Sequence, residues 1–168
     1  ICRNNAPLFS CALALLRSGR GIKLVGMDVG PGLIRIMKKL GPLDLPEEDV
    51  HQAINRWTTA ELRRAKRESS VHDRAECLHV LAEGRQTLRE AILWTESLFK
   101  QNGLIQLMSG HKAKGLEFDV VLHLDPHRIP SPYAREGTEE YEQELNVRYV
   151  IETRFKKELF LVNMENFQ

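Results

Sequence analysis

The stretch from residue 105 to residue 125, IQLMSGHKAKGLEFDVVLHLD, constrains the fold of this chain more than any other part of the sequence. Its two apolar runs, at 105–108 and 120–124, are separated by a polar loop at 109–115. Short continuous apolar runs bounded by turn residues are typical of strands buried on both faces of a parallel sheet. The stretch therefore favours an α/β domain with a mainly parallel sheet.

The loop between these two expected strands carries groups that a hydrophobic core does not need. His111, Lys112 and Lys114 place three potential cations within four positions. Gly115 allows a ligand to approach the backbone closely, and Glu117 supplies a carboxylate just beyond it. Cations and backbone donors gathered at strand ends suit a polyanionic ligand.

Composition limits the classes of protein to consider. With 168 residues, 42% of them hydrophobic, the chain can bury one sizeable core. The formal net charge of +1 gives no global attraction to nucleic acid, so any such binding depends on local patches. Three cysteines without metal-ligand spacing favour reduced thiols, and no apolar run has membrane-spanning length. We therefore expect a cytoplasmic domain without membrane contact.

The rest of the sequence predicts several helices and two further short strands. Helices are expected at 7–18, 31–40, 71–83, 85–100 and 139–154, with another from Pro46 to a break at Ser69-Ser70, and strands at 22–25 and 158–163. The helix that begins at Pro46 ends in a basic run comprising Arg56, Arg63, Arg64, Lys66 and Arg67. This run either grips a nucleic-acid backbone or forms a solvated helix face, as charged stripes usually do.

Two segments resemble motifs of the UvrD/Rep-type superfamily one DNA helicases. The first resembles motif V, usually written T-x-H-x-A-K-G-L-E-F, and its matching residues are Ser109, His111, Ala113, Lys114, Gly115, Leu116, Glu117 and Phe118. The second follows in the usual order and spacing and resembles motif VI, E-x-N-L-x-Y-V-x-x-T-R-A, through Glu144, Asn146, Tyr149, Val150, Thr153 and Arg154. The opening segment Cys2-Arg3-Asn4-Asn5 is similar to the start of the family's second motor domain.

This resemblance implies the fold and the domain organisation. It implies the second RecA-like domain of a helicase, a P-loop NTPase-type sheet flanked by helices, with a small helical insertion. Residues 1–42 and 103–168 would form the RecA-like part, and residues 43–102 the insertion. The chain has no G-x-x-x-x-G-K-[ST] loop and no acidic run beside one. We therefore expect an N-terminal RecA-like domain with these parts to precede Ile1 in the same protein.

The resemblance also implies roles for individual residues on the nucleotide side. Arg154 would be the catalytic cation that reaches ATP across a cleft between two motor domains, while Gly115 and Glu117 would contact the nucleotide, Glu117 at its ribose. Thr153 and Tyr149 would hold the motif VI helix and Arg154 in position. Taken without the motifs, Arg154 is more simply a surface arginine at a helix end, and Glu117 a solvated carboxylate.

On the DNA side, the resemblance implies that Ser109 and His111 contact a phosphate of the strand, and that Arg3 or Asn4 touches another. His111 taken alone is more simply an ordinary loop histidine. The sequence also departs from the family's patterns. Gly110 replaces the apolar residue that commonly precedes the motif V histidine, and a bulkier residue, phenylalanine, follows the motif VI arginine.

The implied activity is ATP-dependent translocation along single-stranded DNA, 3′ to 5′ as in the nearer relatives, with unwinding at a duplex junction. ATP with Mg²⁺ would be required, the Mg²⁺ ligands lying on the N-terminal RecA-like domain, and the present domain alone would be inactive. One alternative is a degenerate, non-catalytic helicase-like domain that binds DNA or serves as a scaffold in a helicase–nuclease complex. Another is a nuclease or metal enzyme, for which the sequence has no carboxylate cluster of suitable spacing. His123, Asp125 and His127 lie close together in the sequence and are considered for a metal site, but they have no recognised ligand pattern. The expected compartment is the cytoplasm of a bacterial or phage-infected cell, at the nucleoid.

Overall fold

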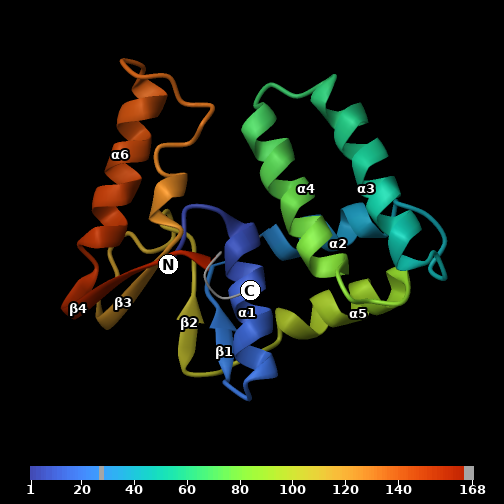
Figure 1. Ribbon diagram of the computed structural model, residues 1–168, viewed down its shortest axis with the longest axis horizontal. Helices are drawn as coiled ribbons and strands as arrows, with labels where there is room; N and C mark the ends of the chain where they lie inside the picture. The colour runs from blue at the N-terminus through green and yellow to red at the C-terminus, as the bar shows by residue number, and fades with distance from the viewer. Residues whose placement is uncertain (27–28, 165–168) are drawn as a thin grey trace.

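The computed structural model describes residues 1–26 and 29–164, which form a mixed α/β fold (Figure 1). Its helices are α1 (Asn5–Arg17), α2 (Val29–Met37), α3 (Glu47–Leu62), α4 (Glu68–Ala82), α5 (Leu88–Leu98) and α6 (Glu139–Glu152), with a short 3₁₀ helix, η1 (Pro126–Arg128). Its strands are β1 (Ile22–Leu24), β2 (Ile105–Leu107), β3 (Phe118–Leu124) and β4 (Phe155–Val162). Each element expected from the sequence has a counterpart here, with shifted ends.

The four strands are parallel. β1 pairs with β2, and β3 pairs with β4. Cys2 joins the two pairs, because it forms a parallel bridge with Ser109 on one side and with Leu124 on the other. Its carbonyl accepts a hydrogen bond from the N–H of Gly110 over 2.9 Å. The spatial order is therefore β1, β2, the segment at Cys2, β3 and β4, and the prediction of a mainly parallel sheet is confirmed.

The helices lie to both sides of the strands. α6 runs beside β3 and β4 at one end of the molecule, whereas α2 to α5 gather beyond α1 at the other end (Figure 1). The N-termini of α4 and α6 point to the same side. Among the described helices, none combines the length and the apolar character that crossing a bilayer requires.

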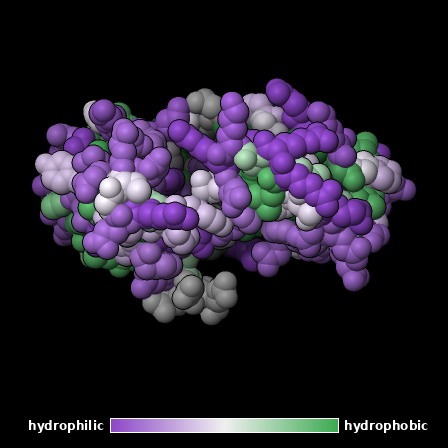
Figure 2. Space-filling view, turned by 90° about the horizontal axis from the view of Figure 1, so that it is seen from above, coloured by the Kyte–Doolittle hydropathy of each residue, from purple (hydrophilic) through white to green (hydrophobic). Residues whose placement is uncertain are grey.

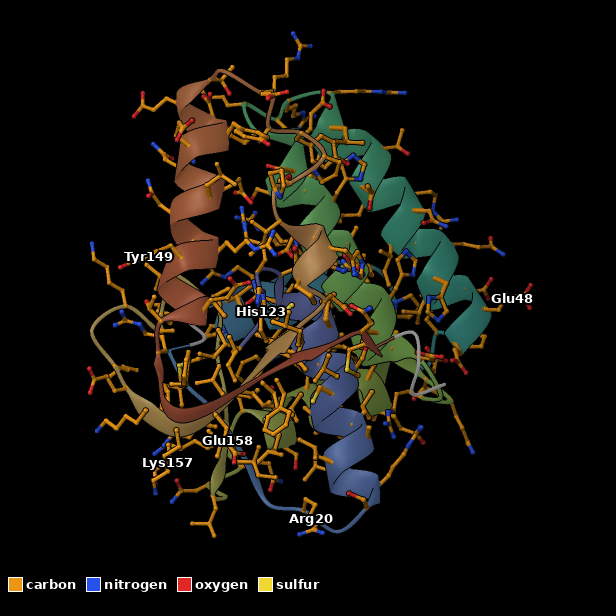
Figure 3. All side chains as sticks on the ribbon, turned by 60° about the vertical axis from the view of Figure 1, so that its left-hand side comes forward. Arg20, Glu48, His123, Tyr149, Lys157 and Glu158 are labelled. Atoms are coloured by element: carbon orange, nitrogen blue, oxygen red, sulfur yellow. The ribbon has the colours of Figure 1, made fainter. Side chains whose placement is uncertain are left out.

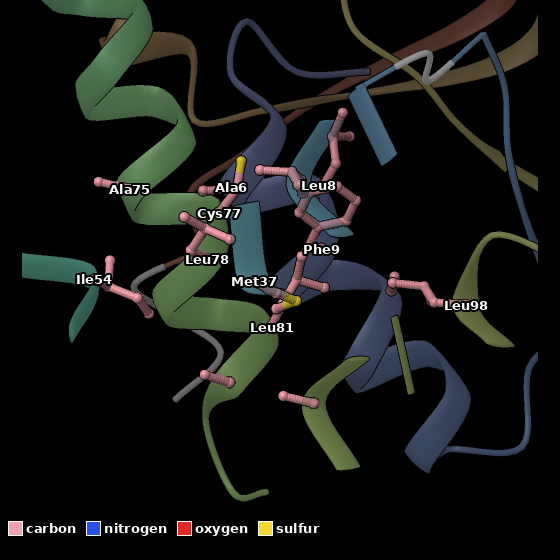
Figure 4. Packing of buried hydrophobic residues seen from close by; sticks show 14 of the residues in the cluster. Ala6, Leu8, Phe9, Met37, Ile54, Ala75, Cys77, Leu78, Leu81 and Leu98 are labelled. Atoms are coloured by element: carbon pink, nitrogen blue, oxygen red, sulfur yellow. The ribbon is translucent and has the colours of Figure 1, made fainter. Parts of the chain in front are cut away.

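The larger hydrophobic core lies where α1 packs against α4. Leu8 and Phe9 of α1 are fully buried among Leu78 of α4 and Met37 of α2 (Figure 4). Buried residues of α3 and α5 belong to the same core. The segment predicted as an insertion, 43–102, thus shares a core with α1 and α2, and its boundaries stay a prediction.

A smaller core holds α6 against the sheet. It contains Met108 and Ala113 from the segment after β2, Val121 of β3, and Val147 and Ile151 of α6. Because Ala113 is fully buried, the segment after β2 cannot move without disturbing this core. The loop predicted to bind a polyanion is therefore fixed to α6 and to the sheet.

The break predicted between the two central helices is wrong in its position. α3 ends at Leu62 and α4 begins at Glu68, so the connection is the segment 63–67. Ser69 and Ser70 lie in the first turn of α4 instead. Serine disfavours helix interiors because its hydroxyl competes for backbone groups, but the first turn has free N–H groups and tolerates it.

Candidate functional site

The loop from Ser109 to Glu117, called the 109–117 loop here, is a series of tight turns between β2 and β3. The carbonyl of Ser109 accepts hydrogen bonds from the N–H groups of Lys112 and Ala113 over 3.0 and 3.1 Å. Gly115 has a φ of +81°, a left-handed conformation that side chains other than glycine strain to adopt. The turns bury Ala113 and leave Glu117 exposed to solvent.

Gly110, a departure from the family pattern, is explained by the position of α6. A Cβ at this position would lie 2.7 Å from Cδ1 of Ile151 and 2.9 Å from Cγ1 of Val147. Both distances are too short for carbon atoms in contact, so a larger residue would require the side chains of Ile151 and Val147, or α6 itself, to shift. The 109–117 loop and α6, which carry the two motif matches, are thus packed directly against each other.

Arg154 lies at the C-terminal end of α6, beside the far end of the 109–117 loop. Its Nη1 donates to the carbonyl of Leu116 over 3.3 Å, and its Nε donates to the carbonyl of Val150 over 2.9 Å. Its own carbonyl accepts from the N–H of Phe118 over 2.9 Å. The structure therefore brings Arg154 next to Gly115 and Glu117, as the three predicted nucleotide contacts require.

Thr153 supports this position of Arg154. Its hydroxyl donates to the carbonyl of Tyr149 over 2.8 Å and accepts from Nη2 of Arg154 over 3.0 Å. Arginine has five N–H donors, and these contacts with protein oxygens use three of them. Tyr149 is 69% exposed on the outer side of α6 (Figure 3), and its contact with Thr153 is through its backbone carbonyl.

Glu117 is exposed and has one cationic neighbour. Its Oε2 lies 3.5 Å from Nζ of Lys156, and both side chains are more than half exposed. An exposed pair of this kind is weak, at about 0–1 kcal/mol, so the carboxylate remains accessible to a ligand.

Arg3 and Asn4 make internal contacts at the N-terminus of α1. Arg3 donates through Nε and Nη2 to the buried carboxylate of Glu144 over 2.8 and 2.6 Å, and these hydrogen bonds raise the pKa of Arg3. Asn4 donates to Asp73 of α4 over 3.0 Å. Contact of Arg3 or Asn4 with DNA stays a prediction, and it would use the donors that these partners leave.

A polar cleft of about 690 Å³ opens between α4 and the segment 127–133, and we call it the polar cleft. Arg3, Asn4 and His111, three of the four predicted DNA contacts, border it, whereas Ser109 does not. Figure 2 views the molecule from the side where α4 and α6 begin, and hydrophilic residues cover most of that face.

His111 is exposed and borders a second, smaller cavity as well, between the 109–117 loop and α6. Partial desolvation lowers the pKa of His111, and the charge on Arg3 lowers it further, against a smaller opposing effect of Glu144. A lowered pKa favours the neutral imidazole, which keeps one N–H donor for a phosphate oxygen.

The three residues considered for a metal do not form a site. His123 is fully buried (Figure 3), and its Nδ1 lies 3.3 Å from Glu152 of α6. Asp125 instead accepts from the N–H of Met164 over 2.7 Å. Within residues 1–26 and 29–164, no group of three or more His, Cys, Asp or Glu side chains is arranged to hold a metal ion.

Sequence reasoning missed two features of this region. One is the pairing of Arg3 with Glu144, which were each noted in separate motifs without being connected. The other is the polar cleft itself, because α4 and the segment 127–133 are distant in the chain. The basic run, of which Arg67 borders the cleft, was the one signal that could have pointed to it.

Comparison with known proteins agrees with this arrangement. The family model of the UvrD-like helicase C-terminal domain matches residues 54–166, about two thirds of the chain, and includes both motif regions. No significant match was found among curated proteins. Because the family match extends over more than half of the sequence and the fold is of the parallel α/β type, the chain belongs to the family of UvrD-like helicase C-terminal domains.

Proposed function

We propose that this domain is the second RecA-like motor half of an ATP-dependent DNA helicase, which moves 3′ to 5′ along single-stranded DNA and unwinds duplex at a junction. Membership of the helicase family supports the proposal. The observation that carries it is the contact of Arg154 with the carbonyl of Leu116, because it joins the motif VI cation to the motif V loop on one rim.

On the nucleotide side, ATP binds between this rim and the N-terminal RecA-like domain of the same protein. Glu117 accepts a hydrogen bond from the ribose, and the left-handed turn at Gly115 lets the backbone approach the nucleotide. Arg154 uses its two remaining N–H donors for the terminal phosphate, where a guanidinium stabilises the charge of the transferring group. Its permanent charge needs no proton uptake.

Mg²⁺ supplies neutralisation of the phosphate oxygens when it is bound. Among the described residues, no group of His, Cys, Asp or Glu side chains fits a metal ion. The Mg²⁺ ligands would therefore lie on the N-terminal RecA-like domain. Arg154 and the 109–117 loop provide orientation and a cation.

On the DNA side, Ser109 and His111 contact a phosphate of the single strand, with Arg3 and Asn4 nearby at the polar cleft. Ser109 and His111 lie toward one end of the 109–117 loop and Glu117 lies at the other, and Ala113 fixes the middle of that loop in the smaller core. A shift of the loop on ATP binding or hydrolysis is therefore transmitted to the grip on DNA, and alternate gripping by the two motor domains gives stepwise movement.

Substitution of Arg154 tests the proposal in the full-length protein that contains both motor domains. Arg154→Ala should leave binding of a fluorescent ATP analogue nearly unchanged and lower DNA-stimulated ATP hydrolysis about 10³-fold or more. Arg148→Ala is the matched control, since Arg148 lies on α6 and pairs with Glu152, away from the rim. Equal turnover in wild type and Arg154→Ala would contradict the proposed role, and wild-type protein that binds DNA without hydrolysing ATP would favour the scaffold alternative.

A further inference from the structure

A pair of stacked rings stands at the polar cleft. Tyr133, from the segment after η1, stacks on His72 of α4 with ring centroids 5.6 Å apart and ring planes within 11° of parallel. Both residues border the cleft, and Tyr133 is 53% exposed. Stacking on His72 aligns the two rings and leaves over half of Tyr133 exposed for another contact.

The cleft also holds one arginine that no group among the described residues neutralises. Arg67 borders the cleft, is exposed, and makes no side-chain hydrogen bond or ion pair with any residue of the described ranges 1–26 and 29–164. The other two arginines at the cleft are engaged: Arg3 with Glu144, and Arg128 with Glu76 over 3.0 Å. Arg67 is thus the guanidinium that remains available to an anionic ligand.

The acidic groups of the cleft are occupied in turn. Glu76 borders the cleft and is paired with Arg128, while Arg3 is paired with Glu144, which does not border the cleft. Asp73 accepts hydrogen bonds from the side chains of Asn4 and Asn5 over 3.0 and 3.1 Å, at the N-terminus of α1. Because these carboxylates face internal donors, they oppose an incoming anion less than their number suggests.

We propose that the His72–Tyr133 ring pair and Arg67 form a nucleobase-stacking station, at which the polar cleft holds one nucleotide of single-stranded DNA beyond the phosphate contact at His111. The inference rests on the proposed function and extends its DNA track from the 109–117 loop to α4. Proteins that grip single strands combine a cationic groove with aromatic rings on which bases stack. A volume of about 690 Å³ is within the range of pockets that enclose one small organic group.

The station gives a role to one residue of the basic run. Arg67 is the last residue of that run and the only member of it that borders the cleft among the described residues. Arg63 and Arg64 are exposed in the same connection between α3 and α4 without bordering the cleft. The run is therefore divided into one ligand-facing arginine and a solvated remainder.

Binding of a short oligothymidylate to the full-length protein, measured by fluorescence anisotropy, tests the station. Tyr133→Ala should weaken binding about 10-fold, and Tyr133→Phe, which keeps the ring, should bind as wild type does. Arg67→Ala should weaken binding and lower its salt dependence, whereas Arg64→Ala, the matched control, should do neither. Thermal unfolding of each variant checks that it is folded.

A cycle with modified DNA makes the test specific for stacking. A series of oligothymidylates carries a single abasic site at successive positions. With the abasic site at one of these positions, the oligonucleotide should bind wild type as weakly as the intact strand binds Tyr133→Ala. At that position the two losses should not add, because base and ring are partners in one contact. Additive losses at every position would overturn the station, as would unchanged binding by Tyr133→Ala.

Two further outcomes separate this inference from the proposed function. If the wild-type protein binds no single-stranded DNA, the proposed function fails together with the station. If it binds DNA and Tyr133→Ala binds equally well, only the station fails. A polyglutamate peptide of equal charge should not displace the oligonucleotide, and displacement at similar concentration would mean that the cleft is selective for acidic peptides rather than bases.

Discussion

Nη1 of Arg154 lies 3.3 Å from the carbonyl oxygen of Leu116, so the end of α6 and the end of the 109–117 loop form one surface. The contact is local in space but spans 38 positions of the sequence. It places the candidate phosphate-binding cation beside Glu117, the candidate ribose acceptor. The proposed nucleotide site requires that both residues reach one nucleotide, and this contact places them on the same surface.

Removal of the carboxylate of Glu117 should abolish discrimination between ribose and deoxyribose. In the full-length protein, Glu117→Ala should raise KM for ATP several-fold while leaving KM for 2′-deoxyATP almost unchanged, because only ATP offers the 2′-hydroxyl as a donor. Steady-state kinetics with both nucleotides measure this. Asp119→Ala is the control, since Asp119 is an equally exposed carboxylate that pairs with Lys157 over 2.7 Å. An equal rise for both nucleotides would argue against a ribose contact.

Addition of a methyl group at Gly110 should separate α6 from the 109–117 loop. We expect Gly110→Ala to lower the free energy of unfolding by about 1–3 kcal/mol, because its Cβ would collide with Ile151 and Val147. Urea denaturation measures the change. Gly32→Ala, within α2 and with open space around its Cβ, should be neutral or stabilising by up to about 1 kcal/mol. A stable Gly110→Ala variant would mean that α6 does not pack as closely as described.

The pairing of Arg3 with Glu144 should contribute to stability. Glu144 is 7% exposed, so Arg3→Ala would leave a largely buried carboxylate without its partner. We expect a loss of about 2–3 kcal/mol, less than for a fully buried pair because the side chain of Arg3 is 25% exposed. Lys38→Ala breaks the exposed pair with Glu96 and should cost less than about 0.5 kcal/mol. Equal effects of the two substitutions in urea denaturation would contradict this ranking.

Acidification should destabilise the domain through histidines that are partly or fully buried. Burial lowers the pKa of His79 and of His123 below the ordinary value. As the pH falls below about 6.5, the unfolded chain takes up protons that the folded chain does not yet bind, so the free energy of unfolding falls until the lower folded-state pKa is passed. Above about pH 6.5, the ordinary histidine pKa, this contribution to the free energy of unfolding is fully present.

Urea denaturation from about pH 7.5 to about pH 5, a range that covers the titration of histidine, measures how the free energy of unfolding depends on pH. His123→Leu removes one of the three histidines whose pKa is lowered, the others being His79 and His111, and should flatten the curve relative to wild type. Stability that rises on acidification, or a curve that is unaffected by His123→Leu, would show that His123 is not held neutral by its surroundings.

The sequence predicted the features that depend on local patterns. The strands on either side of the 109–117 loop follow from two apolar runs, and the places of Gly115 and Glu117 follow from one continuous motif. The features that it did not predict depend on contacts between distant segments. Tyr133 meets His72 across the polar cleft. Arg3 meets Glu144 across most of the chain, and neither pair has a periodicity or a spacing that a single sequence reveals.

Gly110 is a residue that needs both the sequence and the fold to be explained. Its departure from the family pattern was visible in the sequence, but the reason for it was not. Only the fold shows that Ile151 occupies the space that a side chain would need. The error at Ser69 and Ser70 has a similar origin, because the position of a helix start depends on its docking against α1 as well as on local preference.

The most direct test is a structure of the full-length protein with a non-hydrolysable ATP analogue and single-stranded DNA. We predict that the nucleotide lies between the two motor domains, that the ribose is bound by Glu117, and that Arg154 lies within hydrogen-bonding distance, about 3 Å, of a terminal phosphate oxygen. A nucleotide bound elsewhere, with Arg154 and the 109–117 loop facing solvent, would contradict the account.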